Sequence, residues 1–318
     1  MEQEVKASFE EVNDETMFAY KSANEWIDEA KQRPDPTPLW MNLWYEGEVC
    51  CLFADTNVGK SIYAIQIAEE IAKTQPVLYF DFEMSDKQFQ MRYTDAETKE
   101  VHRFPEGFGR LEFSRNGGVL FDLDSIIEHI EVECVRRNAK VVIIDNVTWI
   151  CNRNESGDAA GALMQLLISL KKRRNLSILV LAHTPKRYIY APLTQNSLAG
   201  SKRIANFMDS MFAIGLNKMD RPHGRYIKQI KVRSSELLYG ETNVIVGQLV
   251  KEGCYIHLKH LGTATEKELI EEPDDVQLKM EESRKQIREL LDQKKTVREI
   301  ADQLGISKSY VSKLAKGA

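Results

Sequence analysis

The residues of this sequence best suited to chemistry are Gly59-Lys60-Ser61, which close a short polar loop. Apolar residues 49–53 precede the loop, and apolar residues at helical spacing follow it. A strand, a loop, Gly-Lys-Ser and a helix, in that order, are what a phosphate-binding P-loop requires. The loop N–H groups and the helix N-terminus would face an anion, with Lys60 reaching the β- and γ-phosphates and the Ser61 hydroxyl on Mg²⁺. The expected phosphate-binding set is Ala54, Asp55, Thr56, Asn57, Val58, Gly59, Lys60 and Ser61.

One position departs from the usual motif, which begins with glycine, because this sequence has Ala54 there. Alanine keeps most of the close backbone approach, but a left-handed conformation at Ala54 would cost free energy. The alternative explanation is a chance Gly-Lys-Ser at the start of a helix. The flanking strand and helix argue against that alternative.

Two acids fall at the ends of predicted strands. Asp145 closes the run Val141–Asp145, and Glu83 closes the strand that begins at Val77. The carboxyl ends of parallel strands share one edge of a sheet, and ligands bind at that edge. We expect Asp145 to hold Mg²⁺, directly or through water, and Glu83 to polarise an attacking water, with Asp81 as the next candidate base. Each acid alone could instead be a helix cap or a solvated strand end.

The elements that must position these residues alternate along the chain. Apolar runs predict strands at 49–53, 77–84, 111–114, 141–145 and 177–182, and helical periodicity predicts helices at 62–72, 85–92, 123–136 and 157–174. This alternation predicts an α/β fold with a mostly parallel central sheet and helices on both faces. Four further strands with short turns, at 211–216, 226–232, 243–250 and 254–261, predict an antiparallel flank.

Composition limits the class of protein. The chain has 318 residues, of which 43% are hydrophobic and 29% charged, and this is enough for one large domain and a small one. The net charge of −5 argues against a wholly basic nucleic-acid binder, although a local basic patch remains compatible with it. Five cysteines without a C-x-x-C pair favour a reducing compartment over disulfides or zinc. No apolar run approaches a membrane span and no signal peptide is evident, so we expect a cytoplasmic protein with no membrane partner.

The ends of the chain differ from its centre. We expect a loosely packed helical lead-in at 1–37, the α/β domain at 38–262, a solvated acidic linker at 263–282 and a small all-α domain at 283–318. From residue 284 on, nine basic residues outnumber four acids. Ala301, Gly305 and the neighbouring apolar residues have the spacing of a helix-turn-helix. Its recognition helix would offer DNA the side chains of Ser307, Lys308, Ser309, Tyr310 and Lys313; a three-helix protein-interaction unit is the alternative.

The order of Gly-Lys-Ser, Glu83, Asp145 and His183 resembles RecA-superfamily ATPases over roughly residues 38–250. Residues 82–85 look like the glutamate segment of DnaB-type helicases, and residues 181–186 are similar to RepA-type hexameric helicases and their AAA-type relatives. The tail resembles the helix-turn-helix of site-specific resolvases. This resemblance implies a RecA-like fold, ATP and Mg²⁺ as cofactors, a homo-oligomeric, hexameric ring, Glu83 as the catalytic base and His183 as the γ-phosphate sensor. A hydrogen-bonded core histidine is the alternative for His183.

The resemblance also implies residues that act outside their own site. Lys231 and Arg233 match a Lys-x-Arg pair that reaches the neighbouring subunit's γ-phosphate, an exposed basic strand being the alternative. The loops 148–158 and 184–200, with Arg153, Lys186 and Arg187, would face a central channel and single-stranded DNA. The expected catalytic set is therefore Glu83, Lys60, His183, Lys231 and Arg233.

Together these features predict a Mg²⁺-dependent ATPase that acts on DNA, as a helicase-like or DNA-remodelling motor in replication, mobilisation or recombination of a mobile element. The alternative is a DNA-binding regulator in which ATP switches oligomerisation, hydrolysis is slow and nothing is moved. Ala54 and the weakly basic loops favour the regulator. Glu83 and Asp145 favour hydrolysis.

Overall fold

The computed structural model describes residues 19–113, 122–152, 159–198, 201–270, 274–293 and 295–316. By contacts the chain divides into two units, Met1–Thr37 and Pro38–Ala318. The described part of the first unit contains helix α2 (Ala23–Lys31), whose capping box joins Ser22 and Glu25. None of the residues of α2 is buried.

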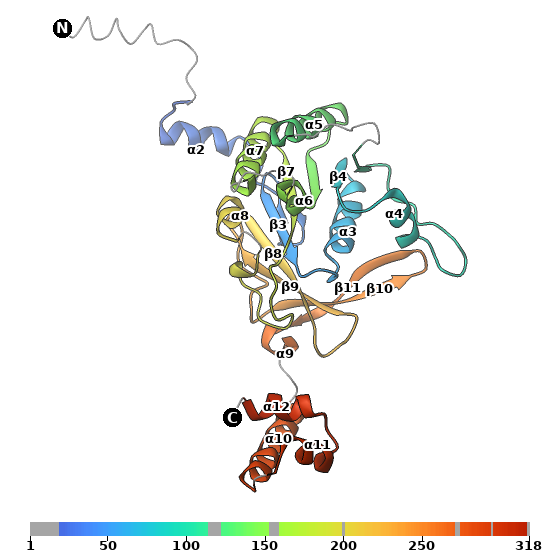
Figure 1. Ribbon diagram of the computed structural model, residues 1–318. Helices are drawn as coiled ribbons and strands as arrows, with labels where there is room; N and C mark the ends of the chain where they lie inside the picture. The colour runs from blue at the N-terminus through green and yellow to red at the C-terminus, as the bar shows by residue number, and fades with distance from the viewer. Residues whose placement is uncertain are drawn as a thin grey trace, which may run out of the picture. The chain divides into compact units, whose positions relative to one another are not determined.

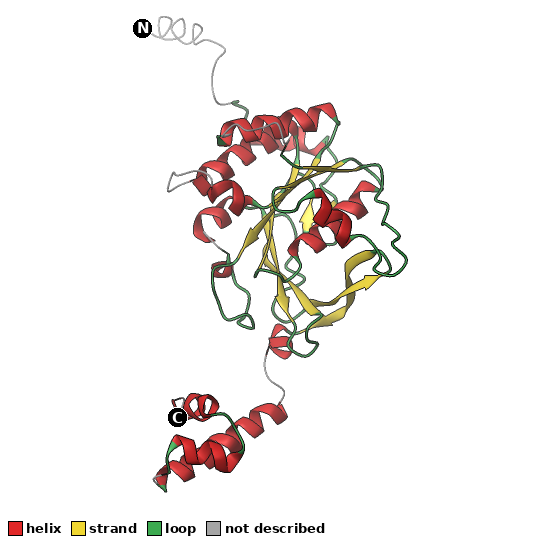
Figure 2. Ribbon diagram, turned by 45° about the vertical axis from the view of Figure 1, so that its right-hand side comes forward, coloured by secondary structure: helices red, strands yellow, loops and turns green. Residues whose placement is uncertain are grey.

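A nine-stranded sheet organises the second unit (Figures 1 and 2). Its strands are β3 (Val49–Ala54), β4 (Val77–Asp81), β5 (Phe108–Leu111), β6 (Val141–Asp145), β7 (Ser177–His183), β8 (Ser210–Leu216), β9 (Gly224–Lys231), β10 (Val244–Glu252) and β11 (Tyr255–Ala264). The order is β11-β10-β9-β8-β3-β7-β6-β4-β5, parallel from β8 to β5 and antiparallel from β8 to β11. The prediction of a mostly parallel sheet with an antiparallel flank is confirmed. Two short strands, β1 (Pro38–Trp40) and β2 (Trp44–Tyr45), pair separately.

Helices cover both faces of this sheet. They are α3 (Lys60–Ala72), α4 (Asp86–Arg92), α5 (Leu123–Arg136), α6 (Val147–Asn152), α7 (Ala159–Arg174) and α8 (Ser201–Phe207), with a 3₁₀ turn η1 (Gln195–Ser197). Figure 1 shows α5, α7 and α8 on one side of the sheet and α3 and α4 on the other. Successive residues of β3 alternate between two cores, Cys51 and Phe53 facing α5 and α7 while Cys50 and Leu52 face α3. The continuous apolar runs are therefore buried on both faces.

Three predicted boundaries in the core were wrong. Strand β5 lies at Phe108–Leu111, three residues earlier than 111–114, and Ser114 is outside the described residues. Strand β4 ends at Asp81, so Glu83 lies in the turn after it. The segment expected to be a channel loop from residue 148 begins with α6, and its residues 153–158 are outside the described part.

The acidic linker was also predicted to begin too early. Strand β11 continues to Ala264, and helix α9 (Glu266–Ile270) buries Glu266, which is 3% exposed. The Glu266 carboxylate accepts hydrogen bonds from Lys228 Nζ at 2.5 Å and from the backbone N–H of Leu193 at 2.8 Å. A count of acids along the sequence cannot show that one of them has a buried partner on another strand.

Three helices form the C-terminal part: α10 (Asp274–Asp292), α11 (Val297–Leu304) and α12 (Lys308–Lys316). They share a core of Ile287, Leu290, Ile300, Ala301, Val311 and Leu314. Gly305, at φ 65°, ends α11 in the left-handed conformation that glycine adopts readily. Helix α10 begins inside the segment expected to be a linker. Among the described helices, none is long and apolar enough to cross a membrane.

Candidate active site

The P-loop begins where β3 ends. Ala54 is the last residue of that strand, where it pairs with His183 of β7 and Ile214 of β8. Within the loop, positive φ angles occur at Asn57 (63°) and Gly59 (112°), and Ala54 is not among the residues with positive φ. The free-energy cost that a left-handed Ala54 would carry therefore does not arise, because the position belongs to the strand.

Gly59 caps helix α3 and is closely covered by the antiparallel flank. A Cβ atom at Gly59 would lie 3.1 Å from Leu249 Cδ1, and its φ of 112° disfavours any other residue. Buried Arg225 of β9 donates from Nε to the Val58 carbonyl at 2.7 Å. Strands β9 and β10 thus support the loop that would hold the phosphates.

Lys60 is folded back against the end of its own strand. Its Nζ donates to the carbonyls of Ala54 at 3.0 Å and Asp55 at 3.3 Å, and lies 3.1 Å from His183 Nδ1. Burial lowers the pKa of Lys60, and the charges of Asp145 and Glu83 oppose that shift. The register that places Ala54 beside His183 brings the P-loop lysine and the expected sensor into direct contact.

Glu83 lies on the other side of His183. Its Oε1 atom accepts a hydrogen bond from Asn146 Nδ2 and lies 3.3 Å from His183 Nε2. An ammonium group only donates, so His183 Nδ1 must accept from Lys60, and Nε2 then carries the proton that faces Glu83. The hydrogen bond from His183 holds the pKa of Glu83 below its ordinary value, against the opposing effect of partial burial. Lys60, His183 and Glu83 therefore form one connected row.

Asp81, the next candidate base, is occupied by structural contacts. Its carboxylate accepts from Arg110 Nε at 2.9 Å and from the backbone N–H groups of Glu83 and Met84 at 3.1 and 2.8 Å. Asp81 is also only 2% exposed. It fixes the turn that presents Glu83, which leaves Glu83 as the better-placed base.

Asp145 lies at the end of β6, in register with Asp81. It is 1% exposed, and burial raises its pKa to about 6, although the hydroxyls of Ser61 and Tyr79 lower it in part. Tyr79 donates to Oδ2 at 2.6 Å, whereas Oδ1 accepts no hydrogen bond of normal geometry from the described residues. A buried, unpartnered carboxylate oxygen near a serine hydroxyl fits Mg²⁺, which takes few protein ligands and fills its shell with phosphate and water.

The Lys-x-Arg pair is at the opposite end of the sheet. Lys231 pairs with Met211 at the start of β8, whereas the P-loop adjoins its other end. Lys231 Nζ donates to the carbonyls of Ala205 and Met208 at 2.8 and 2.7 Å, and Arg233 contacts Asp209 Oδ1 at 2.8 Å. Neither residue is brought to the P-loop of its own chain.

Arg187 supports the P-loop instead of projecting from the loop after β7. Its Nε lies 3.7 Å from Asp55 Oδ2, and it donates to the Ala191 carbonyl. Thr184 also donates to Asp55. Lys186 is exposed, while Arg153 and Gly200 are outside the described residues.

The tail residues expected to contact DNA lie on or beside α12. Ser307 precedes the helix, and its hydroxyl accepts the Tyr310 N–H at 3.2 Å, so this side chain acts as a helix cap. Lys308 is exposed, and Tyr310 lies against the three-helix core. The side chains of Ser309 and Lys313 are outside the described part.

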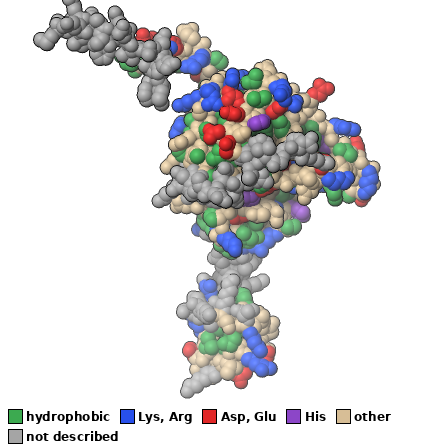
Figure 3. All heavy atoms as spheres, turned by 45° about the horizontal axis from the view of Figure 1, so that its top comes forward, with side chains coloured by type: hydrophobic (Ala, Val, Ile, Leu, Met, Phe, Trp, Pro, Cys, Tyr) green, Lys and Arg blue, Asp and Glu red, His purple; other side chains and the backbone are tan. Residues whose placement is uncertain are grey.

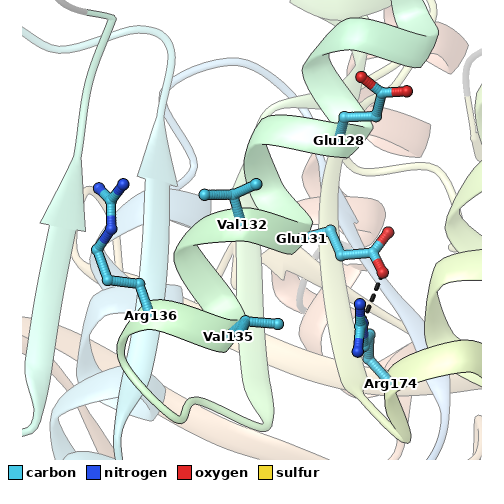
Figure 4. Close-up of a pocket in the computed structure, with 6 residues that line it drawn as sticks. All are labelled: Glu128, Glu131, Val132, Val135, Arg136 and Arg174. Carbon is cyan, nitrogen blue, oxygen red and sulfur yellow. Dashed lines mark hydrogen bonds and ion pairs between the residues drawn. The ribbon is translucent and has the colours of Figure 1, made fainter.

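A surface pocket of about 520 Å³ lies on helices α5 and α7, apart from these residues (Figure 4). Its lining consists of Glu128, Glu131, Val132, Val135, Arg136 and Arg174. Glu131 and Arg174 are paired at 2.5 Å, and the two valines supply the apolar surface. No P-loop residue contributes to it, so the carboxyl edge of the sheet remains the candidate site.

Two site residues were missed by sequence reasoning. Asn146 follows Asp145 directly, and a polar residue in that position was the signal that could have identified it. Arg225 gave no signal, because its contact with Val58 joins segments 167 positions apart.

Comparisons with known proteins show the family and the fold of this chain. The AAA domain family model matches residues 15–188, which is more than half of the chain. The crystal structure of a KaiC-like protein from the hyperthermophilic archaeon Pyrococcus horikoshii OT3 is similar with a TM-score of 0.51 and 15% identity, over 70% of this chain and 95% of that one. At that identity the likeness concerns the fold. No curated protein sequence matches.

Proposed function

Because this chain belongs to the AAA domain family and has a RecA-like P-loop ATPase fold, we propose that it hydrolyses ATP with Mg²⁺ and couples hydrolysis to action on DNA. The main support for ATP hydrolysis is that the side chains of Lys60, His183 and Glu83 contact one another in a row beside the buried carboxylate of Asp145. Phosphoryl transfer needs a phosphate clamp, a carboxylate for the metal, a group that orients water and a sensor. This edge of the sheet supports all four assignments.

The proposed mechanism follows from the present contacts of Lys60. To bind the β- and γ-phosphates, Lys60 must leave two backbone carbonyls and His183 Nδ1. His183 then loses a donor, so its orientation depends on whether the γ-phosphate is present. Glu83 is 40% exposed in its side chain and can take a proton from the attacking water. Magnesium, held by Ser61 and Asp145, would neutralise charge that develops on the phosphate oxygens.

The proposed action on DNA rests on the tail. Helices α11 and α12 with the Gly305 turn have helix-turn-helix order, and Lys308 is exposed at the start of the second helix. Among the described residues that are visible in Figure 3, basic and acidic side chains are interspersed on this face of the larger domain. We propose duplex binding by the tail and a homo-oligomeric ring whose Arg233 acts on the neighbour's nucleotide. The setting would be replication, mobilisation or recombination of a mobile element.

An ATP-switched DNA-binding regulator remains the second candidate. Ala54 no longer supports the regulator, because this residue does not adopt the left-handed conformation. The engagement of Arg187 with Asp55 favours it, because one fewer basic side chain is left for a single strand to contact.

The test is an ATPase assay with and without single-stranded DNA, run beside a strand-displacement assay. We expect Lys60→Ala to abolish nucleotide binding or turnover in a folded protein. Glu83→Gln should bind Mg²⁺-ATP yet turn over at least ~100-fold more slowly, the scale of a lost general base. Normal turnover by folded Lys60→Ala would refute the ATP site. ATPase activity without strand displacement or stimulation by DNA would favour the regulator.

A further inference from the structure

Asn146 occupies the centre of the site without belonging to the P-loop, the metal ligands or the row just described. It is 1% exposed and makes contacts with three different elements. Its Nδ2 donates to Glu83 Oε1 and lies 3.1 Å from His183 Nε2, and its Oδ1 accepts the Trp149 N–H of α6 at 2.8 Å.

The orientation of the Asn146 amide follows from these contacts. The Trp149 backbone N–H can only donate, so the Asn146 oxygen must face α6 and the NH₂ group must face Glu83. His183 Nε2 carries a proton when Lys60 donates to Nδ1. Asn146 and His183 therefore direct two donors at the same Glu83 oxygen, which leaves Oε2 free of both.

Aromatic packing fixes the two segments that Asn146 joins. The Phe82 ring, next to Glu83 in the chain, stacks on the Trp149 ring at 5.4 Å with an interplanar angle of 9°. Phe113 packs against both rings, at 5.0 Å from Phe82 and 5.1 Å from Trp149. The turn that carries Glu83 and the first turn of α6 thus form one rigid contact, with Asn146 at its polar end.

We propose that Asn146 is a positioning residue: it holds Glu83 in a single arrangement, with one carboxylate oxygen bound and the other available to water. This inference rests on the proposed role of Glu83 as the base. A purely structural role would instead be to cap α6. The two roles use different atoms of Asn146, which makes them separable.

Asn146→Asp keeps the oxygen that accepts from Trp149 but replaces the NH₂ donor with an oxygen. Asn146→Ala removes both. We expect each variant of the full-length chain to lower kcat by about 10- to 100-fold, the range for losing a hydrogen bond to a charged group, with the Kd for Mg²⁺-ATP little changed. Asn138→Asp, the same substitution at an exposed turn, is the control and should leave kcat unchanged. A cap role alone predicts wild-type kcat for Asn146→Asp.

A double variant shows whether Asn146 acts through Glu83. If it does, Glu83→Gln combined with Asn146→Asp should be no slower than Glu83→Gln alone. Additive losses would overturn the proposal, as would normal kcat in Asn146→Asp. These results are distinct from failure of the proposed function, which would appear as normal turnover by Glu83→Gln alone.

Discussion

At the scale of single residues, the site combines two buried charges whose environments oppose ionisation. Burial lowers the pKa of Lys60 and raises that of Asp145, although each lies near opposite charge. Asp145 also keeps one oxygen without a partner among the described residues. Without nucleotide and metal, this arrangement costs stability, and binding of Mg²⁺-ATP would offset the cost.

We predict that Asp145→Asn stabilises the metal-free protein at neutral pH while removing Mg²⁺-dependent turnover. The folded pKa is raised from 3.8 to about 6, so protonation favours the folded state. This contribution is complete below pH 3.8 and is lost as pH rises through 6. Asp145→Asn should therefore gain up to about 3 kcal/mol over the native chain above pH 7, and much less at pH 5.

The measurement is urea unfolding in the presence of a chelator at pH 5 and pH 7.5. A difference that does not change with pH would show that Asp145 ionises normally in the folded protein. Ser201→Ala, a substitution far from the phosphate loop in the sequence, is the control variant for this unfolding measurement.

At the scale of elements, the antiparallel flank has a role in the site that strand counting does not reveal. Strand β9 supplies Arg225 to the Val58 carbonyl, and β10 supplies Leu249 to the face of Gly59. Buried Arg225 also donates from its guanidinium to the Pro222 and Gly224 carbonyls. The flank thus sets the shape of the P-loop from outside the parallel sheet.

We predict that Gly59→Ala weakens ATP binding about 5- to 30-fold, because a left-handed conformation costs roughly 1–2 kcal/mol for alanine. The new Cβ would also lie 3.1 Å from Leu249. Adding Leu249→Ala removes that contact but leaves the φ of 112°. Titration with a fluorescent ATP analogue should therefore show only partial recovery. Full recovery in the double variant would mean that the backbone angle is not the limiting factor.

At the scale of the whole molecule, the larger domain extends past the end of the sheet. Helix α9 closes it through Glu266, whose carboxylate contacts Lys228, Tyr226 and the Leu193 N–H. Lys228 Nζ also donates to the Leu193 carbonyl at 2.9 Å, so the loop after His183 is tied to α9. We therefore propose that the boundary of the larger domain lies after Ile270.

A chain ending at Ile270 should keep ATPase activity and stability. A chain ending at Leu261 should lose about 3–5 kcal/mol of its free energy of unfolding. The reason is that the shorter chain leaves Lys228 buried without its partner. Urea unfolding of both chains measures the difference, and Glu266→Gln in the full chain should reproduce most of it. Equal stability of the two truncated chains would refute the boundary.

The same truncation tests the tail. The chain ending at Ile270 should lose most duplex-DNA affinity, and Lys308→Ala should weaken binding by the full chain with a reduced salt dependence. Mobility shifts at two salt concentrations provide the measurement. Undiminished binding by the truncated chain would favour the interaction-module interpretation of α10–α12.

The proposed ring leads to a prediction for Arg233. This side chain is 60% exposed and lies far along the sheet from the P-loop of its own chain. Arg233→Ala should lower turnover, and mixing it with Lys60→Ala should restore more activity than dilution allows, because each variant supplies what the other lacks. Strictly proportional loss on mixing would mean that Arg233 acts through Asp209 in its own chain.

The sequence by itself determined the order of the nine strands of the sheet and of helices α3, α4, α5 and α7. It also placed Lys60 and Ser61 between β3 and α3, and Asp145 at the end of β6. These are local properties: apolar runs must be buried, and a P-loop needs a strand before it and a helix after it. The exact limits of α5 and β6 were also predicted: Asp122 caps α5, and the apolar run of β6 ends at Asp145.

Only the tertiary structure decided which polar groups meet. The contact of Lys60 with His183 depends on the register of β3 and β7, and that of Glu83 with Asn146 on the adjacent ends of β4 and β6. The burial of Glu266 depends on a lysine 38 positions away. Hydrogen bonds and ion pairs between strands leave no periodic trace in the chain, because each partner is chosen by the geometry of the sheet and not by its sequence neighbours.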